Sequence, residues 1–206
     1  GTKVTSSDRM FSANTTLYAR WSLKNVAINY MLYGGTNSDN NPTSFVYSAS
    51  AQTVEIPGVP TRSGYKFLKW VVYGGATNGS VDNTSTPAVL HVPAGRRETI
   101  TLVARWAKSY NVYFNSVYVD NDSTTEVPIS DPNGYIYASG HDGMFNAAVM
   151  YEGATGLPTA SRTGYYFLGW TVSVNGSDLN RVDFPVGVPF SAPSGFADWS
   201  YLYPVF

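Results

Sequence analysis

The sequence predicts a mostly β fold, with an α+β fold as the alternative, arranged as two tandem small modules. Tyr (16) and Phe (10) are abundant among the 206 residues, and charged residues make up only 13%. Aromatic residues suit a half-buried pleated surface, and several segments alternate apolar and polar residues with the period of a strand. One motif also occurs twice, at an offset of 100 residues. We therefore expect four to five strands and at most one short helix in each module.

The first predicted strand opens each module. From Val26 to Leu32 every second residue is apolar, and a glycine pair follows. Period-two alternation is typical of a strand with one buried face. Residues 25–29 resemble residues 111–115 at an offset of 86. The same opening strand is therefore expected in the second module.

The middle of each module is ambiguous. Residues 45–54 and 145–151 are apolar runs too short to separate a helix from a strand by periodicity. The two alanines of the second run favour a short helix there. A short helix and an irregular strand both remain open for these segments.

The strongest strand signal lies in the repeated block. Residues 62–70 recur as residues 162–170, both with the pattern Arg-x-Gly-Tyr-x-Phe-Leu-x-Trp. Alternation predicts that Leu68 and Trp70 share a face and that Tyr65 and Phe67 take the opposite one. A further strand, residues 100–106, closes the module with an aromatic residue. The predicted core residues of the repeats are Trp21, Leu68, Trp70, Leu102, Trp106, Leu168, Trp170, Leu202 and Phe206.

The repeats also predict the domain boundaries. Residues 16–21 match residues 101–106 at an offset of 85, so residues 1–21 resemble the C-terminal strand of a preceding repeat. Module 1 is then residues 22–106, and module 2 is residues 107–206. Because the offset grows from 86 to 100 within the module, about 14 extra residues are expected in a loop-rich stretch of module 2. Whether the modules flex at residues 107–109 is left open.

Charge and cysteine content exclude several functions. The net charge is −1 without a basic face, which argues against nucleic-acid binding. No apolar run approaches the ~20 residues that span a bilayer. The absence of cysteine excludes disulfides and thiol catalysis. The sequence suggests no cofactor.

Catalytic and metal signals are weak. His91 and His141 lie in non-equivalent places, and no Gly-x-Ser-x-Gly elbow accompanies them. Asp120, Asp122 and Glu126 alternate as oxygen ligands of a calcium loop do, but the glycine and the distant glutamate of an EF-hand are missing. A polar hairpin is the favoured interpretation of this segment, and we expect no enzyme.

The repeated motifs resemble the Listeria–Bacteroides repeat, also called the internalin B-repeat. Residues 60–70 read Pro-Thr-Arg-Ser-Gly-Tyr-Lys-Phe-Leu-Lys-Trp, and residues 15–21 read Thr-Thr-Leu-Tyr-Ala-Arg-Trp. Lys69 stands where the family commonly has the glycine that Gly169 retains. Residues 201–206 are a degenerate closing strand, and Pro204 predicts that this strand lies exposed at a sheet edge. The resemblance implies a β-grasp-like module of secreted or cell-surface bacterial proteins.

The expected function is that of a non-catalytic stalk, spacer or adhesion element. The alternative is a module that binds a carbohydrate or protein ligand through aromatic and Asn/Asp-rich loops. The candidate loops are residues 116–143, with Tyr135 and Tyr137, and residues 173–181. The partner would be a host or cell-wall glycan or protein.

Overall fold

The structure is a computed structural model that describes residues 18–19, 22, 24–120, 123–139, 145–172 and 181–206, with backbone only for 118–120, 123–125 and 139. Trp21, Asp122, His141 and most of residues 173–181 lie outside the described residues, so the predictions for them stay predictions.

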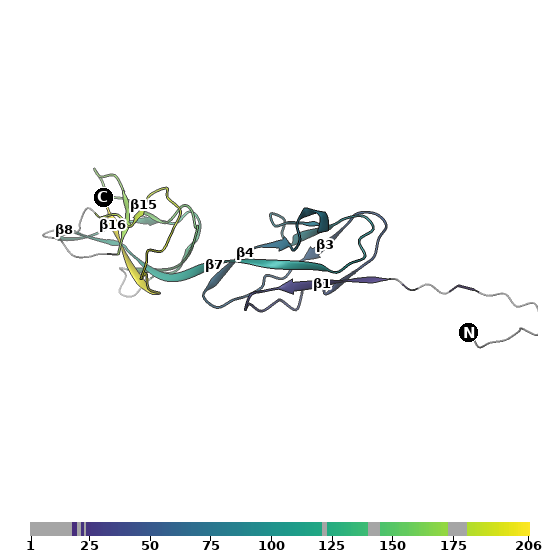
Figure 1. Cartoon of the computed structure of the whole chain (residues 1–206). Coiled ribbons are helices and arrows are strands. Elements are labelled where there is room, and N and C mark those ends of the chain that lie inside the picture. The colour runs from purple at the N-terminus through teal and green to yellow at the C-terminus, as the bar shows by residue number, and fades with distance from the viewer. Residues whose placement is uncertain (1–17, 20–21, 23, 121–122, 140–144, 173–180) are drawn as a thin grey trace, which may run out of the picture.

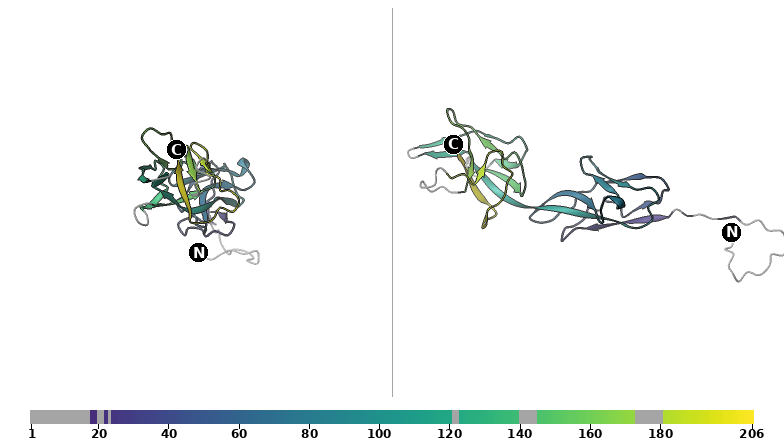
Figure 2. Two further views of the ribbon diagram at one scale, coloured as in Figure 1. Left: turned by 90° about the vertical axis from the view of Figure 1, so that its left-hand side faces the viewer. Right: turned by 45° about the horizontal axis from the view of Figure 1, so that its top comes forward.

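The fold is mostly β, as predicted, and the described residues contain one short helical element, the 3-10 helix η1 (Ala76–Asn78). Two lobes of strands lie at opposite ends of the long strand β7 (Ile100–Asn115) (Figure 1), and a second view agrees (Figure 2). The strands of module 1 are β1 (Asn25–Met31), β2 (Ser44–Val46), β3 (Gln52–Ile56), β4 (Tyr65–Val72), β5 (Ser80–Asp82) and β6 (Ala88–Val92). Those of module 2 are β8 (Val117–Asp120), β9 (Ser123–Glu126), β10 (Ile129–Ser130), β11 (Ile136–Ser139), β12 (Phe145–Tyr151), β13 (Thr159–Ala160), β14 (Gly169–Thr171), β15 (Phe184–Pro185) and β16 (Ser200–Val205).

Strand β7 (Ile100–Asn115) belongs to both modules. Its first half pairs in parallel with β1 and antiparallel with β4, and its second half pairs antiparallel with β12 and in parallel with β16. The predicted boundary between residues 106 and 107 therefore falls inside a strand. Residues 107–109, left open as a hinge, are part of this strand.

Module 1 packs two sheets together. Strands β2, β1, β7 and β4 form one layer, and β3, β6 and β5 form the other. Apolar side chains from both layers meet in one core that includes Val26, Ile28, Trp70, Leu90 and Leu102. The pairing of the first and last strands is parallel, but in the described residues no α-helix crosses the sheet. The β-grasp-like description stays a prediction.

Module 2 has a separate core. It gathers residues of β7, β12, β14 and β16 with loop residues such as Phe190. Trp170, Leu202 and Phe114 are almost completely buried, and Phe206 packs against the core partly buried. The Trp170 Nε1–H donates to the Pro158 carbonyl at 2.6 Å, so its burial leaves no polar atom unpaired.

Equivalent contacts and strand registers recur in the two modules, but the opening strands align at an offset of 84, not 86. Tyr30 packs on Trp70 as Phe114 packs on Trp170. The Lys24 carbonyl accepts a hydrogen bond from the Tyr47 N–H, and the Lys108 carbonyl accepts one from the Glu152 N–H. The predicted alignment was two residues out, an error that leaves every side chain on its expected face because strands repeat every two residues.

The prediction that Leu68 and Leu168 belong to the core is wrong. Their side chains are 48% and 45% exposed. In β4 the register shifts between Phe67 and Lys69, so Leu68 is the extra residue of a β-bulge. The bulge breaks the alternation and turns Phe67 toward Trp70, with ring centroids 5.1 Å apart. Phe167 packs on Trp170 in the same way at 5.4 Å.

Two further expectations are corrected in module 2. Residues 145–151 form the strand β12, one of the two alternatives left open, and not the short helix that the alanines favoured, because the alternate residues Ala148 and Met150 face the core beside β7. The degenerate closing strand, β16, was expected at a sheet edge because of Pro204. It lies between β7 and β14, and its pairing with β7 ends at Leu202, before the proline.

Candidate functional site at the module junction

At the junction between the modules, β7 passes from pairing with β4 to pairing with β12 without an unpaired residue. The Ser109 N–H donates to the Gly64 carbonyl of module 1 at 3.0 Å, and the Lys108 carbonyl accepts from the Glu152 N–H of module 2 at 2.9 Å. Adjacent residues of one strand are thus bonded to different modules. Hydrogen bonds on both sides oppose bending here, because bending would break them without replacement.

Side chains reinforce this junction. Ala107 is buried opposite Lys66 of β4. The Lys66 ammonium lies 6.0 Å from the centre of the Tyr151 ring in module 2, at the outer limit of a cation–π contact. The Lys108 ammonium lies 4.7 Å from the Tyr110 ring. Two cations on the strand pair therefore cover aromatic rings of module 2.

An open groove of about 570 Å³ lies beside the junction. It contains both predicted ligand-loop residues. The Tyr135 hydroxyl already donates to the Thr155 carbonyl at 2.7 Å, and burial raises its pKa. Tyr137 is 55% exposed. The groove is lined by Lys66, Asn133, Gly134, Tyr135, Tyr137, Val149, Tyr151 and Thr155.

A cluster of aromatic rings covers the outer face of the module 2 sheet. Tyr113 and Tyr201 are paired across β7 and β16 and stack with centroids 5.0 Å apart. The ring centroids of Trp199 and Tyr113 lie 5.3 Å apart. The equivalent pair in module 1, in the same register, is Asn29 and Thr101. The scaffold thus folds without these rings, which are a feature of module 2 alone.

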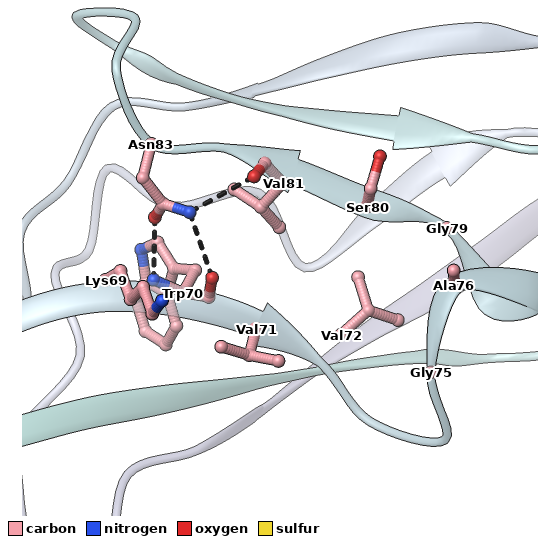
Figure 3. A pocket seen from close by; sticks show the side chains of 10 residues that line it. All are labelled: Lys69, Trp70, Val71, Val72, Gly75, Ala76, Gly79, Ser80, Val81 and Asn83. Atoms are coloured by element: carbon pink, nitrogen blue, oxygen red, sulfur yellow. Dashed lines mark hydrogen bonds between the residues drawn. The ribbon is translucent and has the colours of Figure 1, made fainter.

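A hollow of about 270 Å³ lies beside Trp70 in module 1. Figure 3 shows that Asn83 spans its rim. The Asn83 carboxamide accepts from the Trp70 N–H at 2.7 Å and donates to the Trp70 carbonyl at 3.1 Å, as a neighbouring strand would. These bonds hold the β4 backbone in place, so we assign the amide a structural role.

Asp183 occupies the equivalent position in module 2, 100 residues on. Its backbone N–H donates to the Trp170 carbonyl at 3.0 Å, and its carboxylate accepts from the Val172 N–H and the Thr171 hydroxyl, both at 2.9 Å. Burial alone would raise the pKa of this carboxyl. These hydrogen bonds and Arg181 outweigh it, so the pKa lies below its usual value.

The calcium candidate gains no support from the backbone. In the β8–β9 hairpin Asp120 pairs with Ser123, whereas Glu126 pairs with Val117 at the other end, about 10 Å along the strands. In the described part of the chain, no group of three or more His, Asp or Glu side chains could hold a metal ion. A calcium site that includes Asp122 remains a prediction.

The exposed His91 lies in β6 between Thr53 of β3 and Ser80 of β5. His141 lies outside the described residues. The structure therefore does not place the two histidines together.

Sequence reasoning missed the shared strand and the aromatic outer face. A signal for the first existed, because no Gly or Pro interrupts residues 100–115 and their even-numbered positions are mostly apolar. Aromatic residues at 113 and 201 were visible too, but the face they share depends on a pairing between distant strands.

The fold is that of a mostly β protein in which one strand joins two separate cores. In a comparison with family models, residues 27–94, most of module 1, match the Listeria-Bacteroides repeat domain. Repeats of this family are typical of surface proteins. Comparisons with curated proteins and with solved structures gave no match. Among the described residues, no helix is long and apolar enough to cross a membrane.

Proposed function

We propose that this chain is a non-catalytic, extracellular segment of a bacterial surface protein that acts as a stiff spacer. The observation that carries the proposal is the continuous strand β7, which serves as the closing strand of module 1 and the opening strand of module 2. Tandem domains joined by a flexible linker sample many orientations. A shared strand that pairs with β4 up to Lys108 and with β12 from Ser109 onward restricts that freedom.

The arrangement of the lobes supports a spacer. They lie at opposite ends of β7, so each module adds length along the strand (Figure 1). Repeat proteins in which each unit contacts only its neighbours gain reach by number of units. The family match at residues 27–94 supports a surface location, where such reach presents a binding domain away from the cell.

A distance measurement between modules tests the stiffness. The chain has no native cysteine, so exposed Glu55 and Tyr166 can be changed to cysteine and spin-labelled. We expect a single narrow distance distribution. The control inserts Gly-Ser between Lys108 and Ser109, which separates the two junction hydrogen bonds and should broaden the distribution. A native distribution as broad as that of the insertion would refute the spacer.

Ligand binding is the second candidate function. It is favoured by the aromatic rings that module 2 carries where module 1 has Asn29 and Thr101, and by the exposed Tyr137 in the junction groove. Large contiguous patches of exposed apolar side chains are typical of binding surfaces.

A glycan-array screen tests this second candidate. We expect specific binding that is lost in Tyr137→Ala or Trp199→Ala but kept in Tyr166→Ala, a control that removes an exposed ring elsewhere in module 2. An array without specific signal would leave only protein ligands for this surface. The proposed lack of catalysis is checked separately, because a rate above blank in a broad hydrolase screen contradicts it.

A further inference from the structure

In each module the strand by which the chain enters lies directly beside the strand by which it leaves, and the two are parallel. In module 1, β1 pairs with β7 from Ile28 opposite Ile100 to Met31 opposite Val103. In module 2, β7 pairs with β16 from Val112 opposite Ser200 to Phe114 opposite Leu202.

This geometry decides how each module meets a pull on the chain ends. The entering strand is drawn toward its N-terminal end and the leaving strand toward its C-terminal end. Because the strands are parallel, these pulls act in opposite directions along one axis and slide the strands past each other. The interstrand hydrogen bonds cross that axis and are loaded together. An antiparallel pair pulled apart from one end would instead lose its bonds one at a time.

The two sheared pairs are connected without an unpaired gap. Strand β4 pairs with β7 from residue 102 to residue 108, and β12 pairs with it from residue 109 to residue 115. Force that leaves the β1–β7 pair therefore enters the β7–β16 pair through one strand that is held along its length.

We propose that the chain is a tension-bearing element in which the β1–β7 and β7–β16 pairs are two mechanical clamps in series. The inference rests on the proposed spacer function. It adds that the spacer carries tension between the cell surface and the ligand that the surface protein binds. It assigns resistance to force to hydrogen bonds between terminal strands, and not to the cores of the modules.

Single-molecule force spectroscopy of the whole chain tests the proposal. One variant carries Lys24→Cys and a cysteine appended after Phe206, so that both clamps are sheared. The control carries Tyr73→Cys and Glu98→Cys, exposed sites at one end of the β4–β7 pair, where a pull peels antiparallel strands apart. We expect two unfolding events in the first geometry, each at several-fold the force of the control. Equal forces in the two geometries would overturn the proposal.

A second measurement separates the clamp from general stability. Leu90→Ala in β6 empties part of the module 1 core but leaves the β1–β7 pair untouched. Forced unfolding is governed by the unfolding rate along the pulled direction. We expect a clear loss of stability to denaturant with little change in the shear force. A force that falls in step with stability would contradict the clamp, while narrow spin-label distances would still leave the spacer standing.

Discussion

The Phe114 ring meets the Trp170 ring edge-on, with centroids 4.6 Å apart, at the centre of module 2. Tyr30 and Trp70 repeat this contact at 5.3 Å in module 1. The opening strand thus supplies one ring and the repeated block the other. Edge-to-face pairs add about 0.5–1.5 kcal/mol to the burial of the rings themselves.

Replacing either tryptophan with alanine should destabilise the core in which that tryptophan is buried. Trp170→Ala and Trp70→Ala are each expected to lower the free energy of unfolding by about 3–5 kcal/mol. Because the cores are separate clusters, each variant should mainly lower the stability of its own module, and chemical denaturation followed by residue-resolved hydrogen exchange would show this. Equal loss of protection in both modules would show that they unfold as one unit.

The glycine that precedes the tryptophan of the repeated block should contribute to stability in module 2 only. Gly169 has a φ of 145°, and a Cβ there would overlap the Phe184 carbonyl of β15. We expect Gly169→Lys to cost about 2 kcal/mol or more in thermal or chemical unfolding. The reverse change, Lys69→Gly, should cost only about 0.5–1 kcal/mol, because Lys69 is an exposed ladder residue opposite Arg105. Similar losses would contradict this account of the departure at residue 69.

The Asn83 amide should stabilise β4 through its backbone contacts. Asn83→Ala leaves the Trp70 N–H and carbonyl without these partners and is expected to cost about 1–3 kcal/mol. Hydrogen exchange should show faster exchange of the Trp70 amide. Gln52→Ala, which removes a single exposed bond to the Val46 carbonyl, is the control and should cost less. An unchanged Trp70 exchange rate would rule out the proposed role.

Asp183 should make module 2 sensitive to acid. Its pKa in the folded state lies below the usual value of 3.8, so the ionised carboxylate adds stability above about pH 3.8. That contribution is lost as the pH falls through the folded-state pKa. Asp183→Asn should therefore destabilise the protein by roughly 1–2 kcal/mol at neutral pH, and the difference from the native chain should shrink below pH 3.8. A constant difference across the pH range would disprove the linkage, with Asp39→Asn at an exposed site as the control.

Local patterns predicted much of the fold. The alternation from Val26 to Leu32, the repeated block and the burial of Trp70, Leu102, Trp170 and Leu202 were all readable from spacing and composition. These features depend on residues near one another in the chain, where the period of two acts directly.

The errors arose where distant strands decide the outcome. The bulge at Leu68 exists because β4 must turn Phe67 toward Trp106 while it keeps pairing with β7. The strand at residues 145–151 contains two alanines and gains its structure from β7 beside it. The repeat pattern places a boundary at residue 106, between the closing strand of module 1 and the opening strand of module 2. That boundary hid the fact that the two strands are one.

The join inside β7 also constrains how a gene for such a protein can gain or lose copies. Core side chains occupy even-numbered positions on both sides of the join, from Leu102 and Ala104 to Tyr110 and Val112. A crossover that added or removed one codon there would turn one module inside out, because a one-residue slip exchanges the faces of a strand. The number of modules can therefore change only by recombination events that keep the core residues of β7 at alternate positions in both modules.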